Sequence, residues 1–279
     1  MFENDWVCPK RLGGSKAISM YNLYLKNRRN QHPYENVKYS DVVNEVHENG
    51  YAIMKSAIDI NLLNAIKTKS EAIFSDPRRL KTNDVKYETV RHPFIDCPEI
   101  LNLALSETIF NVVSQFYGCI PALTGGKIHR SYAYTGEKTG THLYHIDKNS
   151  LWFIKAFVYL NDVGLNGGPF TYVRGSHKNR FDGWNNHYRY SDQQIISEYG
   201  EKNIKPITAS VGDVIFANTV GMHKAQTMNE GHRTMVTLNF CVHPEDWSPQ
   251  SKFIMVRHTD LNEVETGKKI LFDYTRKIR

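Results

Sequence analysis

The residues best suited to chemistry in this chain are His145, Asp147, His223 and Arg233. Two imidazoles and one carboxylate form the ligand set of non-haem iron centres that keep coordination positions open for oxygen and a further ligand. An arginine shortly after the second histidine is suited to bind an anionic ligand through a bidentate contact with its carboxylate. If the four side chains converge in space, the sequence predicts an oxygen-using metalloenzyme.

The spacing of His145 and Asp147 allows them to share one metal ion. Residues i and i+2 of a strand point to the same face, so both side chains can reach one ion while Ile146 points away. His142 lies three residues earlier and would point to the opposite face of a continuous strand. We therefore exclude His142 as a ligand. A His-x-Asp tripeptide alone is common by chance, so the assignment depends on the sequence around it.

The downstream sequence predicts short strands separated by turns. Residues 151–160 are apolar, aromatic and β-branched, which is typical of a buried strand. Glycines and a proline bracket a short strand over 170–173, and a glycine turn leads into a strand over 211–217. His223 follows that strand, and residues 234–242 alternate enough to form another one. The candidate ligands thus lie among the strands of a β-rich core.

The upstream sequence predicts helices and one further strand. Residues 41–49 form a short helix ended by glycine, and residues 51–54 form a strand. A helix capped by Asp59 extends to Phe74, and a second one spans residues 99–117. Residues 76–96 are expected to be a polar loop. The two long helices are expected to cover the outside of one sheet.

Residues 127–134 alternate in polarity and are expected to form the strand before the His-x-Asp tripeptide. If the face that carries Ile128 points inward, Arg130 and Tyr132 line the pocket. The alternative is that Arg130 pairs with a surface carboxylate. The polar and aromatic residues 178–206 interrupt the strands, which indicates a lid or binding loop.

The order of these motifs resembles the phytanoyl-CoA dioxygenase family of Fe(II)/2-oxoglutarate-dependent oxygenases. The resemblance covers residues from about 40 to about 245. It is carried by the His-x-Asp tripeptide, a strand ending in Leu-Asn-Asp, the stretch G-G-P-F-x-x-V-x-G-S-H-K, the stretch G-D-V-I-F, and a distal His and Arg. Residues 46–54 also resemble the opening helix and first strand of the family.

The resemblance implies a mainly β fold with flanking helices around a double-stranded β-helix core of the jelly-roll, cupin-like kind. It implies that His145, Asp147 and His223 hold Fe(II), and that Arg233 binds the distal carboxylate of 2-oxoglutarate, with O2 as the other cosubstrate. Relatives that halogenate replace the carboxylate ligand with a small residue, so Asp147 implies hydroxylation or a related oxidation rather than halogenation. The remaining cosubstrate pocket is assigned to Phe157, Tyr132 and Lys127, although Phe157 is equally compatible with a place in the core.

Two positions depart from the family pattern. The arginine usually stands eleven residues after the distal histidine, whereas Arg233 stands ten after His223. A serine or threonine often stands two residues after that histidine and binds 2-oxoglutarate, whereas this chain has Ala225. We therefore expect the corresponding hydrogen bond to be missing.

Basic and aromatic residues near the predicted pocket mouth favour a polar or anionic small molecule as substrate. The residues assigned to substrate binding are Arg130, Arg91, Trp184 and Tyr188. The net charge is +6, but the basic residues are dispersed and accompany no nucleic-acid-binding motif. We expect neither a nucleic-acid partner nor a membrane one, because no long apolar run is present.

Four scattered cysteines and an acidic N-terminus without an apolar segment favour a reduced, cytoplasmic protein. We expect residues 1–279 to form a single domain. Its parts are an N-terminal arm (1–38), a helical support region (39–118), a β-helix core with a lid insertion (119–245, with 178–206 as the lid) and a C-terminal extension (246–279). Two other functions fit the sequence: a cupin-type metalloenzyme that does not use 2-oxoglutarate, and a catalytically inactive binding protein on the same fold.

Overall fold

Two β-sheets face each other at the centre of the computed structural model, which describes residues 14–84, 86–147, 150–179, 181, 189–242, 254–273 and 275–278. The seven strands of the large sheet pair antiparallel throughout. In spatial order they are β1 (Tyr51–Met54), β8 (Val214–Asn218), β5 (Ile154–Tyr159), β10 (His232–Cys241), β4 (Ala122–Tyr132), β3 (Tyr87–Val90) and β2 (Leu80–Asn83).

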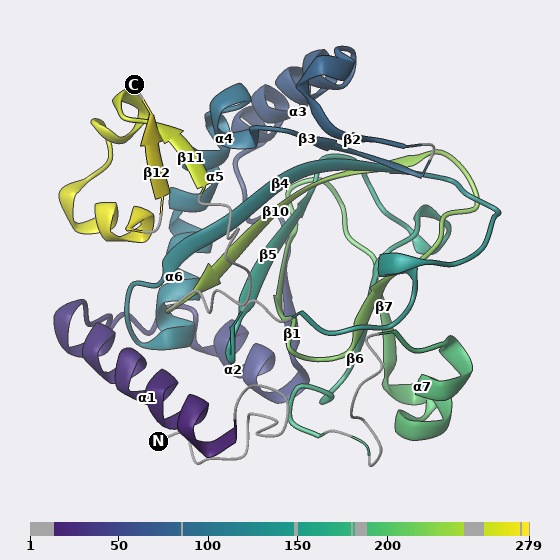
Figure 1. The fold of residues 1–279 in the computed structure, drawn as a ribbon, viewed down its shortest axis with the longest axis horizontal. Coiled ribbons are helices and arrows are strands. Elements are labelled where there is room, and N and C mark those ends of the chain that lie inside the picture. The colour runs from purple at the N-terminus through teal and green to yellow at the C-terminus, as the bar shows by residue number, and fades with distance from the viewer. Residues whose placement is uncertain are drawn as a thin grey trace.

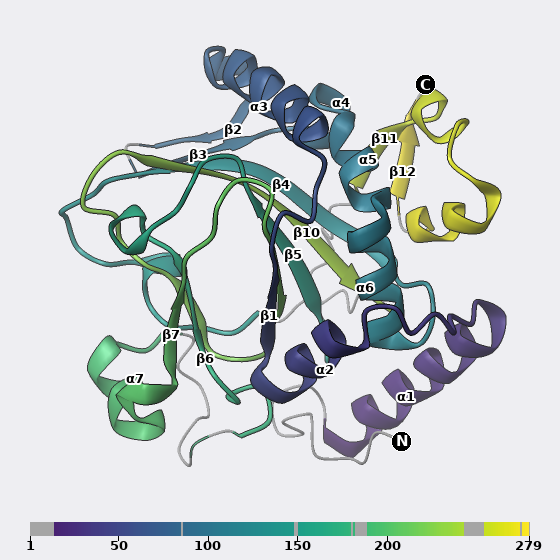
Figure 2. The same ribbon diagram turned by 180° about the vertical axis from the view of Figure 1, so that it is seen from behind.

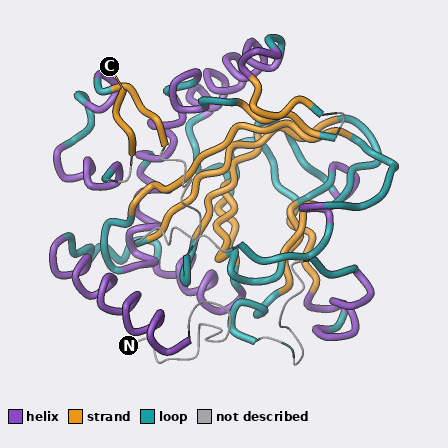
Figure 3. The backbone as a smooth tube through the Cα atoms, viewed as in Figure 1, coloured by secondary structure: helices purple, strands orange, loops and turns teal. Residues whose placement is uncertain are grey.

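The small sheet has three antiparallel strands and lies opposite β1, β8 and β5 (Figure 1). Its strands are β7 (Ile204–Ile207), β6 (Phe170–Val173) and β9 (His223–Ala225). This is the jelly-roll, or double-stranded β-helix, core that the sequence predicts. Figure 3 shows the strands of these two sheets in the middle, with loops and α7 (Asp192–Tyr199) on one side and most of the other helices on the opposite side.

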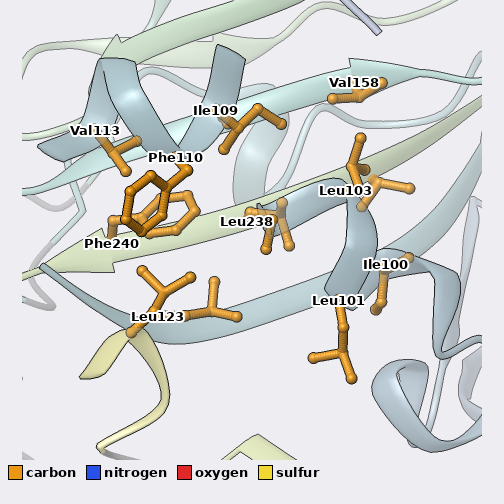
Figure 4. Close-up of a cluster of buried hydrophobic side chains, with 14 of the residues drawn as sticks. Ile100, Leu101, Leu103, Ile109, Phe110, Val113, Leu123, Val158, Leu238 and Phe240 are labelled. Carbon is orange, nitrogen blue, oxygen red and sulfur yellow. The ribbon is translucent and has the colours of Figure 1, made fainter. Parts of the chain in front are cut away.

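The outer face of the large sheet is apolar and packs against helices. These are α2 (Ser40–Asn49), α3 (Ile60–Phe74), α5 (Glu99–Leu105) and α6 (Glu107–Tyr117). Figure 4 shows apolar side chains of α5 and α6 packed against Leu123, Val158, Leu238 and Phe240 of the sheet. Because alternate residues of a strand point to opposite faces, burying this side leaves the other set of residues facing the small sheet.

The inner face carries a second, more aromatic cluster. Phe157, Tyr159 and Met235 of the large sheet pack with Phe170 and Tyr172 of the small sheet. The rings of Phe157 and Phe170 are 4.6 Å apart. This cluster joins the two sheets and forms the apolar part of the jelly-roll interior.

Local signals explain where the helices begin and end. The Asp59 carboxylate accepts hydrogen bonds from the backbone N–H groups of Asn61 and Leu62, which fixes the start of α3. Gly50 ends α2 with φ of 92°, and a Cβ there would lie 2.4 Å from the Tyr172 ring. Gly50 therefore permits both the left-handed turn and the close approach of the small sheet. The helix α7 begins after Ser191, whose side chain accepts a hydrogen bond from the Gln194 N–H.

Three segments differ from the sequence-based predictions. Residues 14–31 form a helix, α1 (Gly14–Gln31), instead of an irregular arm. Its buried stripe is Tyr21, Leu25 and Arg28, and the arginine hides the helical period from a count of apolar residues. Arg28 is tolerated there because it donates to the carbonyls of Ile120 and Pro121.

The second and third differences lie between residues 76 and 117. The expected loop over 76–96 contains the β2–β3 hairpin, with η1 (Pro77–Arg79) before it and α4 (Pro93–Asp96) after it. Its short strands are too polar to be distinguished from a loop by alternation. The expected helix over 99–117 is divided at Ser106, whose extended backbone (φ −53°, ψ 144°) ends α5 and begins α6.

The C-terminal segment contains two short parallel strands, β11 (Ile254–Arg257) and β12 (Thr275–Ile278), joined by η5 (Thr259–Leu261) and η6 (Thr266–Phe272). The remaining short helices are η2 (Gly140–His142), η3 (Leu165–Gly167) and η4 (Glu201–Asn203). The C-terminal segment and α1 lie on the helical side of the large sheet, far from α7 (Figure 2). Among the described helices, none combines the length and apolar character needed to cross a membrane.

We predict that Leu238→Ala lowers the free energy of unfolding by about 2–5 kcal/mol, because it leaves a cavity between the large sheet and the helices. Chemical denaturation measures the effect. Leu165→Ala is the matched control, since the Leu165 side chain is 62% exposed, and should change stability by less than about 0.5 kcal/mol. Equal effects of the two substitutions would contradict the assignment of the outer core.

Candidate metal centre

His145, Asp147 and His223 converge at the end of the small sheet. His145 and His223 exchange two backbone hydrogen bonds of 2.9 Å, and the Asp147 N–H donates to the carbonyl of Thr219. Each side chain offers one ligand atom, and these atoms lie within 4.8 Å of one another. Two imidazoles and one carboxylate at this separation can hold one metal ion on one face of its coordination sphere.

Both histidine rings are oriented by carbonyl groups of the backbone. The Nδ1 atom of His145 lies 2.9 Å from the Leu143 oxygen, and that of His223 lies 2.9 Å from the Gly221 oxygen. A carbonyl oxygen only accepts, so each Nδ1 carries the hydrogen and each Nε2 keeps its lone pair. This is the tautomer that a metal ligand needs, held by the kind of outer partner that metal-binding histidines use.

The charge state of the three groups also suits a metal. Burial, reinforced by the neighbouring His145, lowers the pKa of His223 to about 3. Burial likewise lowers the pKa of His145. Burial alone would raise the pKa of Asp147, but Lys155 and the two imidazoles outweigh it and hold that pKa well below its usual range. All three groups are therefore deprotonated and able to donate electron pairs at neutral pH.

Lys155 of β5 lies against the ligand cluster, and the strand pattern over 151–160 does not single it out. Its Nζ atom lies 2.7 Å from Oδ2 of Asp147. It shares the inner face with Phe157, which stands two residues later on the same strand. The alternation of residues along β5 could have indicated it, because a lysine within an apolar strand needs a buried anion as its partner.

Arg233 is buried on the inner face of β10, paired in register with Ser131 of β4. One guanidinium nitrogen, Nη2, lies 3.5 Å from the Ser131 hydroxyl. Within the described part of the chain, its Nε and Nη1 atoms have no hydrogen-bond partner, and no carboxylate forms an ion pair with it. A buried guanidinium without an anion is costly, so this position is prepared for an anionic ligand.

The other residues predicted for the cosubstrate pocket divide between the two faces. Phe157 lies on the inner face, and its neighbour Phe170 has its ring 5.4 Å from that of His223. Lys127 shares this face by register, opposite Thr237 of β10. Tyr132 lies on the outer face and donates a 2.5 Å hydrogen bond to Glu88 of β3, so the structure places it away from the metal centre.

Two of the residues predicted to bind substrate, Arg130 and Arg91, are described by the structure, and it places neither in the cluster. Arg130 lies on the outer face, where it pairs with Glu71, hydrogen-bonds Thr234 and lies over the Phe74 ring. The alternative, pairing with a surface carboxylate, is the one observed. Arg91 donates to the Leu80 carbonyl at the base of the β2–β3 hairpin. Trp184 and Tyr188 lie outside the described residues.

Arg130 would line the pocket only if the face of β4 that carries Ile128 pointed inward. In the structure the other face of β4 points inward. Ile128 belongs to the core cluster under the helices, so Lys127, His129 and Ser131 face the interior. His142, excluded as a ligand by parity, lies at the end of η2 and outside the three-residue group.

Residues 35–235 match the family model described as phytanoyl-CoA dioxygenase (PhyH). The chain belongs to this family. The match contains the His-x-Asp tripeptide, the distal histidine and Arg233. No curated protein matches this PhyH-family chain in a sequence search.

Solved structures with the same fold include two non-haem, α-ketoglutarate-dependent enzymes and one protein solved with nickel and 2-oxoglutarate. The epimerase SnoN from nogalamycin biosynthesis is 14% identical with a TM-score of 0.57. The alignment covers 74% of this chain and 83% of SnoN. The carbocyclase SnoK from the same pathway is 18% identical with a TM-score of 0.56, over 72% of this chain and 82% of that one. HygX from Streptomyces hygroscopicus, solved with nickel and 2-oxoglutarate, is 17% identical with a TM-score of 0.54, over 77% and 90%.

We predict that Asp147→Ala weakens Mn(II) binding by more than about a hundredfold, since loss of even an outer partner of a ligand typically costs 10–100-fold. Isothermal titration under anaerobic conditions measures the affinity. His142→Ala is the matched control and should bind Mn(II) as the unchanged protein does. Equal loss in both variants would contradict the assignment of the ligand set.

We also predict that the metal-free protein loses stability as the pH falls from about 6.5 towards 3. Burial holds the pKa of both His129 and His223 at about 3 in the folded protein, against about 6.5 in an unfolded chain. Between these pH values the unfolded chain binds protons at these histidines and the folded chain does not, so acid favours unfolding. Urea denaturation in the presence of a chelator gives the slope, which should be flatter in His129→Leu. A slope unaffected by that substitution would contradict a buried neutral His129.

Proposed function

We propose that this protein is an Fe(II)- and 2-oxoglutarate-dependent dioxygenase. In the proposed reaction it hydroxylates an unactivated C–H bond of a polar or anionic small molecule and releases succinate and CO2. The observation that carries the proposal is the buried guanidinium of Arg233 on the inner face of β10. Among the described residues no carboxylate pairs with it, and its Nε and Nη1 atoms have no hydrogen-bond partner. A group of three metal ligands alone fits many reactions, but the buried guanidinium of Arg233 needs an anionic ligand.

The proposed roles follow from the positions of the side chains. His145, Asp147 and His223 would hold Fe(II) on one face of its coordination sphere and leave the opposite positions to 2-oxoglutarate and O2. When bound, the iron with these cosubstrates supplies an oxidant able to break a C–H bond. Arg233 would bind the distal carboxylate through its free Nε and Nη1 donors.

The aromatic inner cluster would shield the reacting centre from water. Phe157 and Phe170 lie between the two sheets beside His223, and Met235 belongs to the same cluster. Excluding water strengthens the contact between Arg233 and its carboxylate, because charges interact more strongly in a medium of low polarity. Lys155 would fix the orientation of the Asp147 carboxylate, whose Oδ2 atom lies 2.7 Å from Nζ of Lys155 and 3.6 Å from Nε2 of His223.

Asp147 favours hydroxylation over halogenation, since its carboxylate occupies the position that a halide would need. The similarity in fold to an epimerase and a carbocyclase adds two other outcomes of C–H cleavage. The mass of the product distinguishes the three, because hydroxylation adds one oxygen, cyclisation removes two hydrogens and epimerisation leaves the mass unchanged. We propose that residues 1–279 act as one domain, with residues 178–206 beside the entrance.

We predict that Arg233→Leu weakens 2-oxoglutarate binding by roughly a hundredfold, since each hydrogen bond to a charged group is worth about 1.5–3 kcal/mol. Isothermal titration of the Mn(II)-loaded protein without oxygen measures the dissociation constant. Mn(II) affinity itself should change little, because Arg233 contacts none of the ligands.

Arg130→Gln is the control for this experiment, because Arg130 lies on the outer face and should not affect 2-oxoglutarate binding. An unchanged 2-oxoglutarate affinity in Arg233→Leu would remove the basis of the proposal. Metal binding without any 2-oxoglutarate binding would favour a cupin-type metalloenzyme. A failure to bind either would favour an inactive binding protein.

A further inference from the structure

Two histidines that are not metal ligands accompany Arg233. His129 stands on the inner face of β4, paired in register with Met235. It is the diagonal neighbour of Arg233 across β4 and β10, at a separation that long side chains bridge. His142 closes the short η2 helix, which contacts β9, the strand of the metal ligand His223, and lies three residues before His145.

Each of these histidines has an enclosed nitrogen without a partner. The Nδ1 atoms of both rings are buried, and no residue in the described ranges hydrogen-bonds them. Arg233 adds its Nε and Nη1 atoms to the same set. The two histidines of the metal cluster differ, because His145 and His223 each contact a carbonyl through Nδ1.

Electrostatics ties both rings to Arg233. Burial and then the charge of Arg233 lower the pKa of His129 to about 3, and the same two causes, in the same order, lower that of His142. Both rings are therefore neutral at neutral pH. A neutral imidazole has one N–H donor, and its tautomer adjusts to the partner it meets.

A carboxylate is the ligand that matches this set of nitrogens. A carboxylate only accepts hydrogen bonds, and its two oxygens offer several lone-pair positions. Its negative charge would also provide the anionic partner of the Arg233 guanidinium. The small sheet offers no substitute at the corresponding position, since Ala225 shares a face of β9 with His223 and has no polar atom. Within the described ranges, the unpartnered imidazole nitrogens available to an anion at Arg233 therefore come from β4 and η2.

We propose that His129 and His142 complete the Arg233 site, each donating an N–H to the distal carboxylate of 2-oxoglutarate. This rests on the proposed function, because it assigns further residues to the same cosubstrate. It makes the site a three-sided one: the guanidinium comes from β10, one imidazole from β4 and the other from the loop that leads to the metal ligands. Neither histidine contributes to metal binding.

The test compares two chelating ligands on Mn(II)-loaded protein without oxygen. Oxalate binds a metal as the keto-acid end of 2-oxoglutarate does but lacks the distal carboxylate. We expect His129→Leu and His142→Leu each to weaken 2-oxoglutarate binding by about tenfold or more, as for loss of a hydrogen bond to a charged group. Oxalate binding should stay within about threefold, and His129→Gln, which keeps an N–H donor, should retain most of the 2-oxoglutarate affinity.

Thermal unfolding separates this role from a structural one. Removing an unpartnered buried nitrogen should leave the melting temperature of the ligand-free protein unchanged or higher. A second measurement uses the unaltered chain and so does not depend on how a variant folds. Imidazole nitrogen NMR of the Zn(II)-loaded protein should show the His129 and His142 signals shifting with 2-oxoglutarate and not with oxalate.

Leucine variants that bind 2-oxoglutarate as tightly as the unaltered protein would overturn the inference, as would equal weakening of oxalate. If the unaltered protein binds 2-oxoglutarate and Arg233→Leu does not, such results would leave the proposed function intact. If the unaltered Mn(II)-loaded protein fails to bind 2-oxoglutarate at all, the proposed function itself fails.

Discussion

The antiparallel register of β10 with β4 and β5 is the constraint on which the rest of the structure depends. It sends Val236, Leu238 and Phe240 towards the helices, and Arg233 and Met235 towards the small sheet. A slip of one residue would exchange the two faces, placing a guanidinium under the helices and a leucine in the interior. The free energy gained by burying the outer face therefore also holds the polar residues of the inner face in place.

The two faces of the sheet differ in how their polar groups are satisfied. On the outer face, Arg130 is fully engaged by Glu71, Thr234 and the Phe74 ring. On the inner face, Arg233 and His129 retain nitrogens that no described residue accepts. Natural proteins leave few buried polar atoms unpaired, and such a group at one location indicates a ligand site more directly than its residue types do.

Much of the fold and the ligand set is predictable from sequence, because these depend on local signals. The His-x-Asp spacing, the Asp59 cap and the apolar strand before Asn161 each involve neighbouring residues. The face that each residue of β4 occupies is not set by local signals. Both sets of alternate residues contain polar side chains, and only pairing with β10 decides which set faces inward. That is why Arg130 and Tyr132 were assigned to the pocket while His129 was overlooked. The helix α1 was missed for a related reason, since its buried arginine is paired by distant carbonyls.

That arginine has a consequence for how the molecule opens. Arg28 bonds the carbonyls of Ile120 and Pro121 before β4, and also Asp273 and the Ile270 carbonyl of the C-terminal segment. One guanidinium thus fastens two segments that are far apart in the sequence to the same edge of the core. When α1 detaches, the C-terminal segment loses a principal anchor, so the two should exchange their amide hydrogens as one cooperative unit. The jelly-roll interior, held by its own register, remains closed while that unit opens.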